Sequence, residues 1–139
     1  MTNSIVHISI GPYLFKAELL TSLAPKTCAE FVRLLPFNQK LIQARWSGES
    51  AWIPLGEMKL EVKNENSTSN PLPGEILFYP GGISETEILF PYGKTVFACK
   101  NGVISGNSFL KIVEGIHHLD RVGELVLWHG AQDILFWQE

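Results

Sequence analysis

Short runs in which apolar and polar residues alternate fill much of the chain and predict β-strands. Ile5–Ile10 alternates, Gly11 and Pro12 interrupt the pattern, and Tyr13–Leu20 resumes it, which predicts a β-hairpin. Gly, Pro or Asn bounds the other short apolar runs, as is typical of strands in all-β folds. These runs are Leu41–Trp46, Ala51–Leu55, Glu75–Tyr79, Glu87–Phe90, Thr95–Cys99, Ser108–Val113, Glu124–Trp128 and Gln132–Trp137.

A helical period is convincing in one place, between Pro25 and about Leu35. Pro25 suits the first position of a helix and Pro36 ends it. The apolar residues between them recur at i, i+3, i+4 and i+7 and form one face: Cys28, Phe31, Val32 and Leu35. We expect a single short helical turn at His117–Val122. Many short strands with so little helix predict a mainly β domain, a barrel or a sandwich with a helical cap.

Composition and charge exclude several classes of protein. The 139 residues form one domain, 1–139, with 45% hydrophobic and 18% charged residues. The net charge is −3 and Lys and Arg do not cluster, so we expect neither nucleic-acid nor membrane binding. No apolar run approaches the roughly 20 residues of a membrane span, and the N-terminus lacks the features of a secretory signal. A cytoplasmic location follows by elimination. Cys28 and Cys99 are expected to be free thiols, with a disulfide as the alternative.

The segment from Gln43 to Gly56 has the composition of a binding site. It places Arg45 and Glu49 between Trp46 and Trp52. An arginine fork binds carboxylates or planar polar groups, and a nearby glutamate serves as base or orients the arginine. The alternative is a structural ion pair within the turn. Strand alternation sends Arg45 and Trp46 to opposite faces, which leaves Trp52 as the expected aromatic wall.

The other candidate binding or catalytic residues occur in less specific sequence patterns. Tyr79 followed by Pro-Gly-Gly is either a loop that approaches a ligand or an ordinary turn. His117 and His118 are consecutive and diverge, so we expect a surface cluster and no metal site. Glu85 and Glu87 are expected to face solvent. No motif for a nucleophile, a phosphate loop or a cofactor occurs, and we expect no cofactor.

Two short segments resemble the cyclophilin pattern. One is the opening hairpin followed by Ala24–Phe31 (APKTCAEF), and the other is Gly106–Leu110 (GNSFL). The Gln-Gly-Gly-Asp run of cyclophilin isomerases is missing after Arg45. Across nearly the whole chain, ARWSGESAWIPLG, PGEILFYPGG, GNSFLKI and GAQDILFWQE together resemble an uncharacterised family of small bacterial cyclophilin-like proteins. That resemblance implies a closed or nearly closed β-barrel with a cleft on one side. With the elements expected above, the predicted fold is a cyclophilin-like closed β-barrel with one main helix and a short second helical turn.

The sequence therefore predicts a small-molecule-binding protein, with enzyme activity left open. Arg45 would anchor an anionic or amide-bearing ligand and Glu49 would be its hydrogen-bond partner or general base, which makes both the catalytic candidates. The expected ligand-binding residues around them are Trp52, Tyr79, Asn107 and Phe109. One alternative is a peptidyl-prolyl isomerase or peptide-binding module. The other is a structural or assembly protein, and the apolar C-terminal strand makes a homo-oligomer our expectation in either case.

Overall fold

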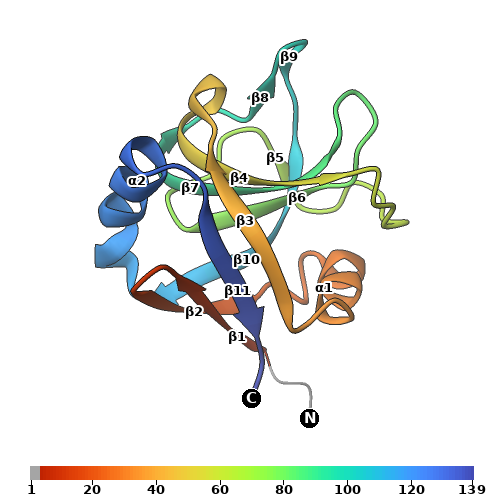
Figure 1. The fold of residues 1–139 in the computed structure, drawn as a ribbon. Helices are drawn as coiled ribbons and strands as arrows, with labels where there is room; N and C mark the ends of the chain where they lie inside the picture. Colours follow the sequence, from red (N-terminus) through yellow and green to blue (C-terminus); the bar gives the residue numbers. More distant parts are fainter. Residues whose placement is uncertain (1–3) are drawn as a thin grey trace.

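The alternating segments close into an eight-stranded antiparallel β-barrel (Figure 1). The computed structural model describes residues 4–139. Neighbours around the barrel follow the order β2, β1, β11, β3, β4, β7, β6 and β10, and pairing of β2 with β10 closes it. The strands are β1 (Ile5–Ile10), β2 (Tyr13–Leu19), β3 (Phe37–Gln43), β4 (Gly48–Gly56), β6 (Glu75–Tyr79), β7 (Thr86–Thr95), β10 (Gly106–Glu114) and β11 (Gln132–Trp137). The mainly β closed barrel expected from the sequence is confirmed.

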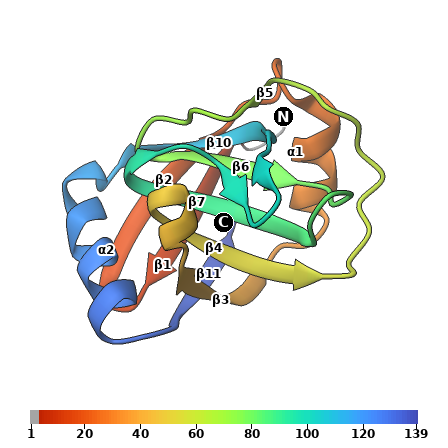
Figure 2. The ribbon, with the colours of Figure 1, turned by 90° about the horizontal axis from the view of Figure 1, so that it is seen from above.

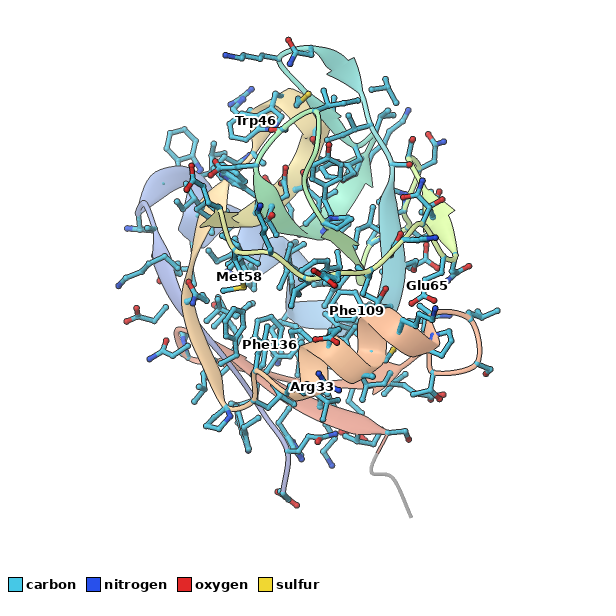
Figure 3. The ribbon with its side chains drawn as sticks, turned by 90° about the vertical axis from the view of Figure 1, so that its right-hand side faces the viewer. Arg33, Trp46, Met58, Glu65, Phe109 and Phe136 are labelled. Carbon is cyan, nitrogen blue, oxygen red and sulfur yellow. The ribbon has the colours of Figure 1, made fainter. Side chains whose placement is uncertain are left out.

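Alternation along the strands fills the inside of the barrel. On β1, Val6, Ile8 and Ile10 are fully buried while the residues between them are half-buried. Helix α1 (Pro25–Val32) packs beside the barrel and inserts Phe31 into the core. The Phe31 ring makes edge contacts with Phe109 and Phe136, at centroid distances of 4.9 and 5.2 Å. Figure 3 shows these two rings directly against the helix.

A second true helix, α2 (Leu119–Trp128), follows a 3-10 turn, η2 (Ile116–His118). The prediction of a strand at Glu124–Trp128 is therefore wrong. The helix is 10 residues long, where a single turn at His117–Val122 was predicted. Leu119, Val122 and Val126 are spaced by three and four residues and are all buried, which is the period of a helix. Figures 1 and 2 show α1 and α2 on opposite sides of the barrel. No helix within residues 4–139 is long and apolar enough to cross a membrane.

The outer face of β6 and β7 is covered as well. Leu77, Tyr79 and Leu89 point outward and are buried under Phe97 and Ile104. The covering segment contains the short hairpin of β8 (Ala98–Cys99) and β9 (Gly102–Val103). Both faces of β7 are thus buried over much of its length, which explains its continuous apolar run.

The segment after β4 crosses the outside of the molecule to the N-terminal end of α1 (Figure 2). It ends in β5 (Ser67–Thr68), which pairs with β10. Glu65 accepts hydrogen bonds from the amide and hydroxyl of Thr27, at 2.6 and 2.7 Å, in the first turn of α1. A carboxylate there satisfies helix donors that have no intrahelical partner and complements the helix dipole. This contact ties the crossing segment to the helix (Figure 3).

Candidate functional site

Arg45 lies in a tight turn. β3 ends at Gln43, and residues Arg45–Ser47 form a 3-10 turn, η1, before β4 begins at Gly48. The predicted strand through Trp46 is therefore too long. Gly48 has a φ of +100°, and a Cβ there would lie 2.6 Å from the Lys94 carbonyl oxygen, so this position requires glycine. The turn leaves the side chains of Arg45 and Trp46 exposed.

A cavity of about 470 Å³ lies between this turn, β4, β7 and α2. Arg45 and Glu49 both line it, so the structure brings the two catalytic candidates to one hollow. In Figure 1, α2 stands beside β7 and β4 on this side of the barrel. The complete lining is Gln43, Arg45, Gly48, Glu49, Tyr92, Asp120, Gly123, Glu124 and Leu127.

The floor of this cavity is built around the ring of Tyr92. The Tyr92 hydroxyl donates a 2.9 Å hydrogen bond to Oε1 of Gln43, which fixes the ring between β7 and β3. The ring also lies against Gly123 of α2, where an added Cβ would be 2.4 Å from Cε1 of Tyr92. Glycine at position 123 therefore allows the helix to approach the barrel closely.

Glu49 is held in place by the neighbouring strand. Its Oε1 accepts a 3.0 Å hydrogen bond from the amide of Lys94. Gly93 leaves the necessary room, because a Cβ there would lie 2.7 Å from the same oxygen. The carboxylate is thus anchored through one oxygen by the backbone, independently of Arg45.

The Arg45 side chain makes no ion pair and no hydrogen bond within residues 4–139, whereas its carbonyl accepts from the amide of Gly48 and closes the η1 turn. The structural ion pair with Glu49, which was the alternative from the sequence, is not formed. Three carboxylates line the same cavity, those of Glu49, Asp120 and Glu124, and none of them lies within 4.0 Å of the guanidinium. The Arg45 guanidinium is therefore free to donate hydrogen bonds to a bound carboxylate or another planar polar group.

The four residues expected to bind ligand around Arg45 lie elsewhere. Phe109 is fully buried in the core (Figure 3), and Trp52 packs edge-on against Trp46 at 5.4 Å. The Tyr79 hydroxyl accepts hydrogen bonds from the amides of Ile83 and Ser84 and closes that loop. None of these side chains lines the Arg45 cavity.

Asn107, the fourth of these residues, is fully buried and completely bonded. Its Nδ2 donates to the Thr27 hydroxyl and to the carbonyl of Lys63, each at 3.0 Å. Its Oδ1 accepts from the amide of Glu65 at 3.2 Å. These bonds join β10, α1 and the crossing segment, which is the geometry of a structural side chain.

The histidine cluster lines a separate, smaller hollow of about 360 Å³. His117 and His118 line it together with His7, Lys16 and Trp137. The His7 ring stacks on Trp137 at 5.3 Å, and Lys16 pairs with Glu114 at 3.7 Å. Across residues 4–139 no group of three or more His, Cys, Asp or Glu side chains is arranged to hold a metal ion.

Glu87 is buried, contrary to the expectation that it faces solvent. The side chain lies on the covered outer face of β7, opposite Pro54 and Tyr79, and only 2% of the residue is exposed. Burial, helped by the nearby charge of Glu85, raises the pKa of Glu87 from 4.5 to about 8. Its Oε2 has no hydrogen-bond partner within residues 4–139, and neither does Nε1 of Trp52.

The α2 wall of the cavity was not predicted from the sequence. Asp120, Gly123, Glu124 and Leu127 recur at i, i+3, i+4 and i+7 and form one stripe of the helix. That period is visible in the sequence, but the helix had to be recognised first. Nothing in the sequence shows that this stripe faces residues 43–49.

Comparison with solved structures supports the barrel assignment. The structure of McbB in complex with tryptophan superimposes with a TM-score of 0.73 at 16% identity, over 96% of this chain and 44% of McbB. The solution structure of the hypothetical protein AF2241 from Archaeoglobus fulgidus gives a TM-score of 0.61 at 18% identity, over 98% of this chain and 95% of that protein. This chain thus spans less than half of McbB.

Comparison with functionally curated proteins gives no match. A family model does match, over residues 6–137 and hence almost the entire barrel. The resemblance to an uncharacterised barrel family, made from the sequence, is confirmed. The chain belongs to the family described as protein of unknown function DUF3830.

Proposed function

We propose that this protein binds a small organic anion in the cavity between η1 and α2. Arg45 holds the carboxylate of the ligand, and Glu49 is the hydrogen-bond acceptor or general base beside it. The single observation that carries the proposal is that the Arg45 guanidinium lines a cavity and has no partner among residues 4–139. The exposed guanidinium presents a planar fork of donors at the cavity, which matches a carboxylate bidentately.

The construction of the cavity supports this function. Tyr92 offers an aromatic face and Leu127 an apolar one, and the contacts of Tyr92 with Gln43 and Gly123 hold β7 and α2 in place around them. A concave site with apolar walls and a few fixed polar groups is typical of small-molecule pockets. The backbone-anchored carboxylate of Glu49 belongs to the same pre-formed arrangement.

The structural neighbours suggest a first probe. The McbB structure contains tryptophan, a small molecule with a carboxylate and a flat aromatic ring. At 16% identity this likeness concerns the fold, so the choice of tryptophan rests on its fit to an arginine, a tyrosine face and an apolar wall.

Isothermal titration with indole-3-propionate and with L-tryptophan tests the proposal. We expect both to bind wild-type protein and both to bind Arg45→Gln at least about tenfold more weakly, since the cationic fork is lost. Arg33→Gln is the control, because Arg33 is an exposed arginine at the C-terminal end of α1 that pairs with Glu30. Failure of both probes to bind, or equal binding by Arg45→Gln and wild type, would overturn the proposal.

We also propose a homo-oligomer in a reducing, cytoplasmic setting. Trp128 and Trp46 are 76% and 51% exposed, and both adjoin residues of the cavity lining. Exposed tryptophans of this kind are enriched at protein interfaces. The two free thiols, Cys28 and Cys99, fit a reducing compartment. A monomer mass in light scattering at micromolar concentration would contradict the oligomer.

A further inference from the structure

The helix that faces Arg45 is acidic along its cavity-lining stripe. Asp120 and Glu124 lie one turn apart on α2, and both line the cavity. Like charges at i and i+4 destabilise a helix slightly, so this pairing costs the free protein some stability. Asp120 accepts a hydrogen bond from the amide of Arg121, and Glu124 forms an exposed ion pair with the Arg121 guanidinium at 3.9 Å, which is weak at a protein surface.

Glu49 adds a third carboxylate to the cavity from the β4 side. The hollow therefore contains one guanidinium and three carboxylates. A ligand that carried only negative charge would be attracted by Arg45 and repelled by all three acids. The charged side chains are exposed to solvent, so this repulsion is moderate and is screened by salt.

We infer that the ligand is a zwitterion of the amino-acid class, with an ammonium group close to its carboxylate. This inference rests on the proposed function and adds a binding site for the ammonium group of the ligand. Arg45 binds the carboxylate, and the acidic stripe of Asp120 and Glu124 binds the ammonium. The side chain of the ligand then lies along Tyr92 and Leu127.

This arrangement accounts for two observations together. It explains why Arg45 is left without an internal partner within residues 4–139 although three acids line the same cavity. It also explains why two acids are placed on the stripe of α2 that Gly123 brings close to the barrel. Asp120 also lies in the first turn of α2, where a carboxylate complements the helix dipole, but an anion alone would leave both acids without a contact to the ligand.

Three probes that share an indole ring distinguish the contribution of the carboxylate from that of the ammonium group. L-tryptophan carries both groups, indole-3-propionate lacks the ammonium, and tryptamine lacks the carboxylate. We expect L-tryptophan to bind wild-type protein at least about tenfold more tightly than indole-3-propionate in isothermal titration. Tryptamine should bind weakly, and Arg45→Gln should leave its binding unchanged or make it tighter, because its ammonium is repelled by the guanidinium.

The double variant Asp120→Asn/Glu124→Gln tests the role assigned to the stripe. We expect it to reduce the preference for L-tryptophan over indole-3-propionate to about twofold or less. Binding of indole-3-propionate should stay constant or become tighter, since a repulsion is removed. The matched control is Glu61→Gln/Asp133→Asn, which removes the same charge at exposed positions outside the cavity and should keep the preference.

The possible failures are distinct. If indole-3-propionate binds as tightly as L-tryptophan while Arg45→Gln weakens the binding of both, the inference of a zwitterionic ligand is wrong and the proposed anion site stands. An equal loss of preference in the control variant would also overturn the inference, since the effect would then be one of net charge. If no carboxylate probe depends on Arg45, the proposed function itself fails. All four substituted acids are exposed, and circular dichroism checks that the variants are folded.

Discussion

At the scale of single residues, the cavity depends on groups whose charges are not neutralised inside the protein. Arg45 has no partner within residues 4–139, and Glu49 is held by a backbone amide. These two were predicted from the sequence because an arginine, an acid and tryptophans lie close together there. Their freedom from one another could not be predicted, because it depends on the η1 turn and on Gly48 and Gly93.

Glu87 leads to a prediction on the pH dependence of stability. Its pKa is about 8 in the folded protein and near 4.5 when the side chain is exposed. Between these values the folded state binds a proton that the unfolded state has lost. The stability contributed by this group is therefore fully present below pH 4.5 and is lost as the pH rises to about 8. Each pKa unit corresponds to about 1.4 kcal/mol, so the loss from this group is a few kcal/mol.

Urea unfolding of Glu87→Gln between about pH 5 and pH 8 measures this effect. The glutamine side chain stays neutral, so we expect the free energy of unfolding of the variant to fall much less with rising pH. The variant should be more stable than wild type at the upper end of the range. Glu85→Gln is the control, because Glu85 is exposed and only assists the shift in the pKa of Glu87. Parallel pH profiles for Glu87→Gln and wild type would contradict a buried, protonated carboxyl.

At the scale of elements, α2 decides where the cavity lies, and the crossing segment holds α1 against the barrel on the opposite side. The contact of α2 with β7 passes through Tyr92 and Gly123, and that of the crossing segment with α1 passes through Glu65 and Thr27. Periodicity predicted α1 well. It was misread for α2, whose apolar residues also fit a short strand until the burial of that helix face is known.

Gly123→Ala should disturb the junction of α2 with the barrel. The new Cβ would lie 2.4 Å from the Tyr92 ring, and overpacking of this kind costs about 1–3 kcal/mol, more than the roughly 1 kcal/mol gained in helix propensity. We expect lower stability and weaker binding of the tryptophan probe. In a Tyr92→Ala background the same change should become neutral or stabilising. Additive effects of the two substitutions in thermal unfolding would argue against this contact.

Asn107→Ala should loosen three elements at once. It removes the three hydrogen bonds of the Asn107 side chain, which join β10 to α1 and the crossing segment, and it leaves buried groups unsatisfied. We expect a loss of about 2–4 kcal/mol in the free energy of unfolding, measured by urea titration. Asn101→Ala, at an exposed turn, is the matched control and should change stability by less than about 0.5 kcal/mol. A ligand-binding role without a structural one would leave the stability of Asn107→Ala near that of wild type.

At the scale of the whole molecule, the closed barrel brings together residues far apart in the chain. Alternating strands, turn residues and the resemblance to a barrel family predicted the architecture. The pairing order did not follow from these signals, and neither did the packing of α2 beside residues 43–49, which lie far from it in the sequence. Trp52, Tyr79, Asn107 and Phe109 have the residue types of a site wall, but the barrel directs them to the core and the covered outer face.

The measurement that tests the account most directly is a titration of ¹⁵N-labelled protein with L-tryptophan, followed by backbone amide shifts. We expect saturable shifts concentrated on the η1 turn, on the cavity-facing stripe of α2 and on the Lys94 amide that is bonded to Glu49. The Arg45→Gln variant should lose them at the same ligand concentration. Shifts that gather instead around His7 and His117, or that are unchanged in Arg45→Gln, would contradict a ligand site at Arg45.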